Sequence, residues 1–204
     1  MINAVLLLVS PGPTWKRLAS ANRPAWAVLL FSFLPAVCIS CAIEAWALAA
    51  HGTYEPSFQR VLKIDPTLAM RYGTCQAVFA LGSLLLASMF IRNIAVGISV
   101  RSSFGQIFKT VAYALSAVYL FRIVDAWDFL NTWLVCGVAA VFVFGVLYTA
   151  MPHFIRPDPA KAFGLYLTFA VIVSACLIAS HILSYLVLEE TLFKGGFGLG
   201  FLGF

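Results

Sequence analysis

Long apolar runs with almost no charge are the feature of this sequence that most limits its fold. They cover residues 25–50, 73–91, 129–150 and 162–188, and Glu44 is the one charged residue inside them. Each approaches or exceeds the roughly 20 helical residues that cross a bilayer. Hydrophobic residues make up 62% of the chain and charged residues 10%, against about 25% charged in soluble domains. This composition excludes both a soluble globular domain and a disordered chain.

A fifth segment, residues 105–124, has a weaker transmembrane pattern. Its charge-free centre covers only residues 110–121, and Lys109 and Arg122 flank it. We expect both cations to snorkel to head groups. A run this short also suits a re-entrant segment, so a four-span bundle is the alternative.

The sequence therefore predicts an all-α, polytopic transmembrane bundle within residues 25–188. The five expected spans are about 25–50, 73–100, 105–124, 129–151 and 162–188. Pro35 predicts a kink in the first. A Gly- and Phe-rich tail follows at residues 189–204.

Residues 51–72 form the one long connection. Phe58, Val61 and Leu62 have the i, i+3, i+4 spacing of a short helix on the membrane surface. An ordinary polar loop is the other interpretation.

Charge predicts orientation. With the N-terminus inside, the inner side holds eight cations and the outer side five, so the positive-inside rule favours an N-in, C-out chain. The inner set is Lys16, Arg17, Arg23, Arg92, Arg101, Lys109, Arg156 and Lys161; the outer set is Arg60, Lys63, Arg71, Arg122 and Lys194. The net charge of +5 is spread along the chain, which fits contact with the lipid bilayer rather than with nucleic acid.

Residues 1–24 form an amphipathic, interfacial segment. Thr14 can cap a short helix there. Trp15, Lys16 and Arg17 then combine an aromatic ring with basic groups, and we expect them to anchor this helix at the inner membrane surface.

Glu44 is the first candidate for an intramembrane polar site, because carboxylates are costly inside a membrane and often functional there. It lies about six residues, or about 9 Å, from the outer end of its helix. Asp125, Asp128 and His181 share that level and complete a candidate outer cluster. An interfacial or structural role for Glu44 is the alternative.

Arg92 and Asn93 are the other candidates inside a span. Arg92 lies about 28 Å along its helix, toward the opposite side of the bilayer from Glu44. We therefore expect Arg92 to snorkel to the inner phosphates rather than pair with Glu44.

The sequence offers no set of residues typical of a catalytic centre, and we expect neither an enzyme nor a cofactor or metal site. Cys38-x-x-Cys41 lies in mid-membrane without a second pair, so both cysteines are expected to be small packing residues. His51 and His181 are the one pair that could ligate a haem, but His51 falls in a loop, so no haem site is expected.

Three stretches carry a family resemblance. They are Leu8–Ala19 with Pro11, Thr14 and Trp15, Phe104–Leu115 with Gly105 and Tyr113, and the joint Arg156–Ala162 with Pro157. With the five spans and their spacing, they make the chain resemble the YIP (Ypt/Rab-interacting protein) family, and its bacterial branch in particular.

The resemblance implies a helical bundle without known catalytic residues, in the bacterial cytoplasmic (inner) membrane. Eukaryotic members associate with Rab GTPases and with each other, and they carry a long polar cytosolic N-terminal region. Only about 24 residues precede the first span here, so Rab binding is not expected.

The leading hypothesis is a non-enzymatic, membrane-organising or protein-interaction module that associates with itself or with other membrane proteins. It draws on small-residue stripes that favour helix packing, namely Ala45/Ala49, Ser83/Ala87 and Cys176/Ser180/Ser184. The alternative is a small transporter or channel-like protein with an outward polar vestibule around Glu44. An intramembrane enzyme acting on lipid is a third, weaker class.

Overall fold

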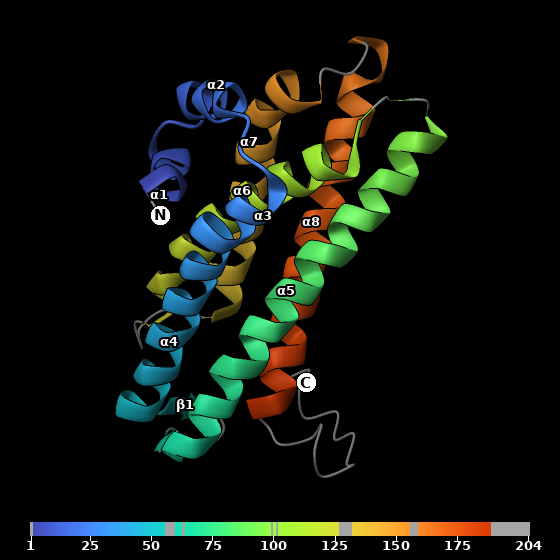
Figure 1. The fold of residues 1–204 in the computed structure, drawn as a ribbon. Helices are drawn as coiled ribbons and strands as arrows, with labels where there is room; N and C mark the ends of the chain where they lie inside the picture. The colour runs from blue at the N-terminus through green and yellow to red at the C-terminus, as the bar shows by residue number, and fades with distance from the viewer. Residues whose placement is uncertain are drawn as a thin grey trace.

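Five long apolar helices form the body of the protein (Figure 1). The computed structural model describes residues 2–55, 60–62, 64–98, 100, 102–126, 132–155 and 159–188. The spans are α3–η1–α4 (Ala25–His51), α5 (Pro66–Gly97), α6 (Phe104–Phe121) with the 3₁₀ turn η2 (Arg122–Ala126), α7 (Thr132–Phe154) and α8 (Pro159–Leu188). This confirms the all-α transmembrane bundle. The predicted tail, residues 189–204, lies outside the described residues.

The third span is the central helix of the bundle. In the most apolar 18-residue stretch of this span, 72% is buried inside the protein. The corresponding stretches of the other four spans are 33–44% buried. It packs against α4, α5 and α7. Because α6 is one continuous helix of 18 residues, about 27 Å long, the re-entrant alternative is wrong. The span with the weakest hydropathy is thus the one that protein, rather than lipid, surrounds.

The first span changes its winding just before Pro35. It begins as α3 (Ala25–Val28), passes through the π-helical turn η1 (Leu29–Phe33) and continues as α4 (Leu34–His51). Proline has no N–H for the regular helical ladder, and at the end of the turn the Leu34 N–H bonds to the Leu29 carbonyl. The sequence predicted a kink at Pro35, and the structure has a π-turn just before this residue.

The long connection differs from both sequence interpretations. Thr53–Glu55 (β1) and Arg60–Leu62 (β2) pair as antiparallel strands, so the surface helix expected there is wrong. Residues 56–59 and 63 lie outside the described part. Helix α5 then begins at Pro66, seven residues earlier than predicted, because proline is well suited to the first turn of a helix.

Two helices rather than one precede the first span. Helix α1 (Ile2–Val9) packs on α6, and α2 (Pro11–Ala21) packs on α7. We call this pair the N-terminal hairpin. The prediction that Thr14 caps the helix is wrong: Ser10 holds the cap position of α2. The Thr14 hydroxyl instead lies 2.8 Å from the Ser10 carbonyl and 3.3 Å from the Leu6 carbonyl.

The bundle has two distinct ends (Figure 1). The amino end holds α2, the last turns of α5 and α7, and the first turns of α6 and α8. The strand end holds β1, the last turn of α4 and the first turn of α5.

Small residues on facing helices pack within the chain. Helices α5 and α8 make the most extensive contact, and the Ser83 hydroxyl donates to the Cys176 carbonyl across it at 3.0 Å. A Cβ placed on Gly73 would lie 2.9 Å from the Ala45 Cβ. These contacts engage one member of each small-residue stripe inside the bundle.

Candidate functional site

Glu44 turns its carboxylate into the bundle. The residue is 5% exposed, and donors from two other elements converge on it. Its Oε1 accepts from the Tyr72 hydroxyl at 2.8 Å and from Arg122 Nη2 at 3.3 Å, and its Oε2 accepts from Gln76 Nε2 at 2.7 Å. Glu44 therefore belongs to a buried polar site.

The two uncharged donors come from one face of α5. Tyr72 and Gln76 are four residues apart, and residues at that spacing lie above one another on a helix. Both are buried. They are available because α5 begins at Pro66, which makes the turn carrying Tyr72 part of the helix and sets it opposite Glu44.

Arg122 is the centre of the site. It is 1% exposed, so the expectation that it snorkels to head groups is wrong. Besides Glu44, its Nη2 lies 3.7 Å from Asp125 Oδ2 and 3.0 Å from His181 Nδ1. Its guanidinium also lies 5.7 Å from the centroid of the Tyr119 ring, within the range of a cation–π contact. The end of the central helix thus places Arg122 among partners instead of near lipid.

His181 joins the site from α8. A guanidinium can only donate hydrogen bonds, so His181 Nδ1 is the acceptor and the ring carries its proton on Nε2. This ring and the ring of Trp133 of α7 pack edge-to-face, with centroids 5.2 Å apart. We call the six residues joined in this way the polar cluster: Glu44, Tyr72, Gln76, Arg122, Asp125 and His181.

The cluster has one cation between two carboxylates, a formal charge of −1 with His181 neutral. Because Arg122 contacts both Glu44 and Asp125, these acids form ion pairs rather than the open carboxylate pair of acid–base catalysis.

Several fully buried polar atoms of the polar cluster have no hydrogen-bond partner within the described part of the chain. They are Arg122 Nε, Arg122 Nη1, Gln76 Oε1 and His181 Nε2.

Other predicted site residues lie elsewhere. Arg92 and Asn93 are exposed, and the Arg92 guanidinium lies over the Phe104 ring, 6.0 Å from its centroid. Arg92 is 16 residues beyond Gln76 on α5, about 24 Å along the helix. It is therefore remote from Glu44, as predicted. Asp128 lies outside the described residues.

Trp15 is buried, and its predicted role as an interfacial anchor is wrong. Its Nε1 donates to the Val146 carbonyl at 2.9 Å. Its ring packs edge-to-face with Tyr113 of α6 and Phe154 of α7, at centroid distances of 6.1 and 5.4 Å. The N–H group of a buried tryptophan usually has a hydrogen-bond partner, and the Val146 carbonyl is that partner here. Lys16 and Arg17, on the opposite face, are exposed.

Two motifs of the family resemblance meet at this contact. Thr14 and Trp15 come from the first motif and Tyr113 from the second, and all three are buried. Pro11 begins α2. A side chain on Gly105 would meet nothing within 4 Å. Pro157 lies outside the described residues.

Sequence reasoning missed Tyr72, Gln76 and Arg122. Tyr72 and Gln76 share a helix face, which was a usable signal once the helix was extended back to Pro66. For Arg122 the signal was the polar content of residues 105–124, where Thr110, Ser116 and Tyr119 are also buried. Polar residues around much of a transmembrane helix indicate that it lies inside the bundle.

Comparison of the chain with models of protein families, with curated proteins and with solved structures finds no match.

Proposed function

We propose that this integral membrane protein is non-enzymatic and conducts or transports a small polar or ionic solute, with the polar cluster as its site. The observation that carries the proposal is the orientation of Glu44. Its carboxylate faces the interior of the bundle, where Tyr72, Gln76 and Arg122 hold it.

The energetic cost of placing charged side chains within a membrane is the physical argument for a function at this cluster. Charged side chains within a membrane are expensive and typically mark ion or substrate pathways. A buried ion pair often contributes no more stability than apolar residues of similar volume. Stability by itself therefore does not favour Glu44 and Arg122 over two leucines.

The free donors and acceptors of the cluster supply a second argument. Buried polar atoms normally have hydrogen-bond partners. Arg122 Nε and Nη1 and Gln76 Oε1 have none within the described residues. A polar solute passing between the helices would find groups there to replace part of its hydration, as expected for a site between helices of a bundle.

Flux through the purified protein tests the proposal. Proteoliposomes would contain a pH-sensitive dye or a dye for monovalent cations, and an imposed gradient would drive the flux. We expect Glu44→Gln to lower the flux at least about tenfold, because it removes the charge and preserves the shape. Arg92→Gln is the matched control, an exposed charge remote from the cluster, and should leave the flux unchanged. Equal flux in wild type and Glu44→Gln would contradict the proposal.

A second candidate is an interaction module of the YIP family type. Two motifs of the resemblance meet through Trp15 and Tyr113, which supports this kinship. The small-residue stripes support self-association less, because Ser83 and Cys176 already pair inside the bundle. Cross-linking in native membranes distinguishes the two functions: a defined oligomer or partner, together with no solute flux, favours the module.

For orientation and location, we propose an N-in, C-out chain in a bacterial inner membrane. The distribution of Lys and Arg supports the orientation, and the YIP resemblance supports the membrane.

A further inference from the structure

The amino end of the bundle carries cations and, among the described residues, no carboxylate. Among the residues whose side chains the structure describes, the acids Glu44, Asp65 and Asp125 lie toward the strand end. In the same part of the chain, five cations lie at the amino end: Lys16, Arg17, Arg23, Arg92 and Lys109. From this separation and the apolar face beside it, we propose that the N-terminal hairpin and the adjoining helix ends bind anionic phospholipid of the leaflet that they face. This inference does not depend on solute transport.

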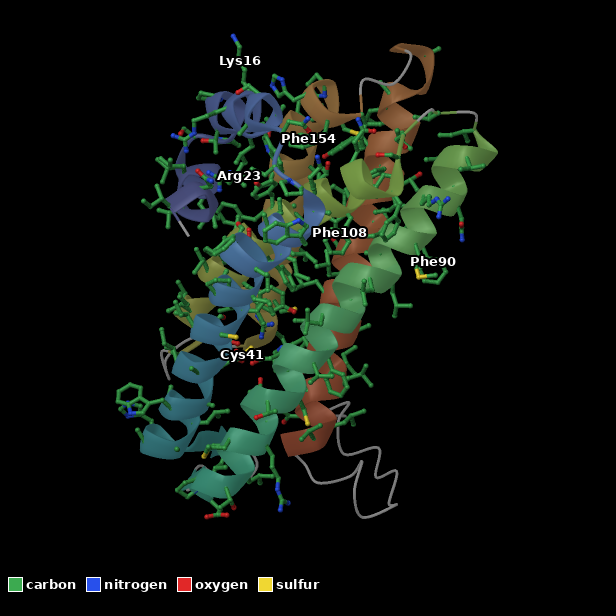
Figure 2. The ribbon with its side chains drawn as sticks, in the orientation of Figure 1. Lys16, Arg23, Cys41, Phe90, Phe108 and Phe154 are labelled. Carbon is green, nitrogen blue, oxygen red and sulfur yellow. The ribbon has the colours of Figure 1, made fainter. Side chains whose placement is uncertain are left out.

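The described part of the chain does not neutralise these cations. Within the described part of the chain, none of the five lies within ion-pair distance of a carboxylate. Arg17 donates to Asn3 Oδ1 at 2.6 Å, and Lys109 donates to Asn22 Oδ1 at 3.4 Å. Lys16 points away from the bundle (Figure 2). The charges are therefore available to an external anion.

Helix α1 supplies the apolar half of the surface. Ala4 and Leu7 pack inward, whereas Ile2, Val5 and Val9 on the other face are 77%, 50% and 78% exposed. An aliphatic stripe of this kind is costly in water and suits acyl chains. In Figure 1, α2 lies at the amino end and α1 lies beside α6, nearer the middle of the bundle. Lys16 therefore lies at the tip of the amino end (Figure 2), and Arg17 reaches α1 itself through Asn3, so the basic side chains border the aliphatic stripe.

These two features together select the ligand. A phospholipid with an anionic head group offers a phosphate for Lys16 and Arg17 and acyl chains for the stripe on α1. An acidic protein segment or a free phosphate would satisfy only the charges and would not itself contact the stripe of Ile2, Val5 and Val9. The buried Trp15 holds the hairpin against α6 and α7, so the surface is preformed.

Native mass spectrometry of the full chain tests this inference. The protein would be released from detergent containing equal amounts of phosphatidylglycerol and phosphatidylcholine, and the retained lipids would be counted. We expect phosphatidylglycerol to be preferred, and the preference to fall about fivefold for each cation removed in Lys16→Gln, Arg17→Gln and Arg23→Gln. Molar salt should weaken the preference, and excess inorganic phosphate should not displace the lipid.

Arg71→Gln is the matched control, because Arg71 is an exposed cation near the strand end. It should leave the preference unchanged. All these side chains are exposed, so the variants should fold normally. The inference is overturned by equal retention of the two lipids in wild type, by a preference that survives the triple substitution, or by displacement with inorganic phosphate.

Discussion

At the scale of single residues, Lys109 and Arg122 show that the surrounding helices decide whether a charged side chain is buried. They flank the same apolar run, yet Lys109 is only partly buried and reaches Asn22, whereas Arg122 is 1% exposed and contacts Glu44, Asp125 and His181. The end of α6 near Arg122 is enclosed by α4 and α7. The cost of desolvating the Arg122 guanidinium is offset by its ion pairs and hydrogen bonds. The side chain therefore does not snorkel to the head groups.

The Glu44–Arg122 pair should show strong energetic coupling. Glu44→Leu or Arg122→Leu alone leaves a buried charge without its partner and should cost about 3–5 kcal/mol. The double substitution should cost less than the sum of the two, and unfolding in detergent would measure all three variants. Arg92→Leu, an exposed control, should change stability by less than about 0.5 kcal/mol. Strictly additive losses would show that the pair does not interact.

Gly73 permits the close approach of α4 and α5. A Cβ at this position would lie 2.9 Å from the Ala45 Cβ and 3.1 Å from the Cys41 carbonyl oxygen, so Gly73→Ala should destabilise the protein by about 1–3 kcal/mol. Gly82→Ala, on the same helix, would meet nothing within 4 Å and should be neutral or slightly stabilising. Thermal unfolding of the two variants gives the comparison, and equal midpoints would contradict it.

At the scale of elements, the N-terminal hairpin shows how one side chain fixes a segment. Helix α2 buries Thr14, Trp15 and Leu18 and exposes Lys16 and Arg17. This is the amphipathic pattern predicted for a helix on a membrane, but its apolar face packs on α7. Amphipathicity indicates that one face avoids water and does not specify whether protein or lipid covers it.

Trp15 should control the docking of this hairpin. Trp15→Ala removes a fully buried ring and should cost about 3–5 kcal/mol, which would release α1 and α2 from the bundle. Trp15→Phe, which mainly loses the bond to the Val146 carbonyl, should cost about 1 kcal/mol. Hydrogen exchange of residues 2–21 would measure the release. Trp26→Ala, at a residue that is 61% exposed, should leave exchange in the hairpin unchanged.

At the scale of the whole molecule, five spans predict that residues before the first span and after the last lie on opposite sides of the membrane. We expect a reporter that is active only outside the cell to be active when fused after residue 126 and inactive when fused after residue 103. The physical reason is the excess of Lys and Arg on the inner connections. Reversed activities would contradict the orientation, and equal activities would contradict a full crossing by α6.

The sequence by itself determined the membrane class and the approximate bounds of four spans, because four runs of about 20 apolar residues that together contain one charge leave few alternatives. The structure decided that residues 105–124 form a fifth span and not a re-entrant segment. Hydropathy also indicated that Glu44 lies inside a span and that Arg92 is remote from it. These properties depend on local composition and helix length alone.

Only the tertiary structure decided which helix is central, where Arg122 and Trp15 point, and that residues 53–55 pair with 60–62. Each of these depends on contacts between segments distant in the chain, such as Glu44 with Arg122 or Trp15 with Val146. A hydropathy pattern reports that a face avoids water. It does not report which neighbour covers that face, because lipid and protein interior are similarly apolar.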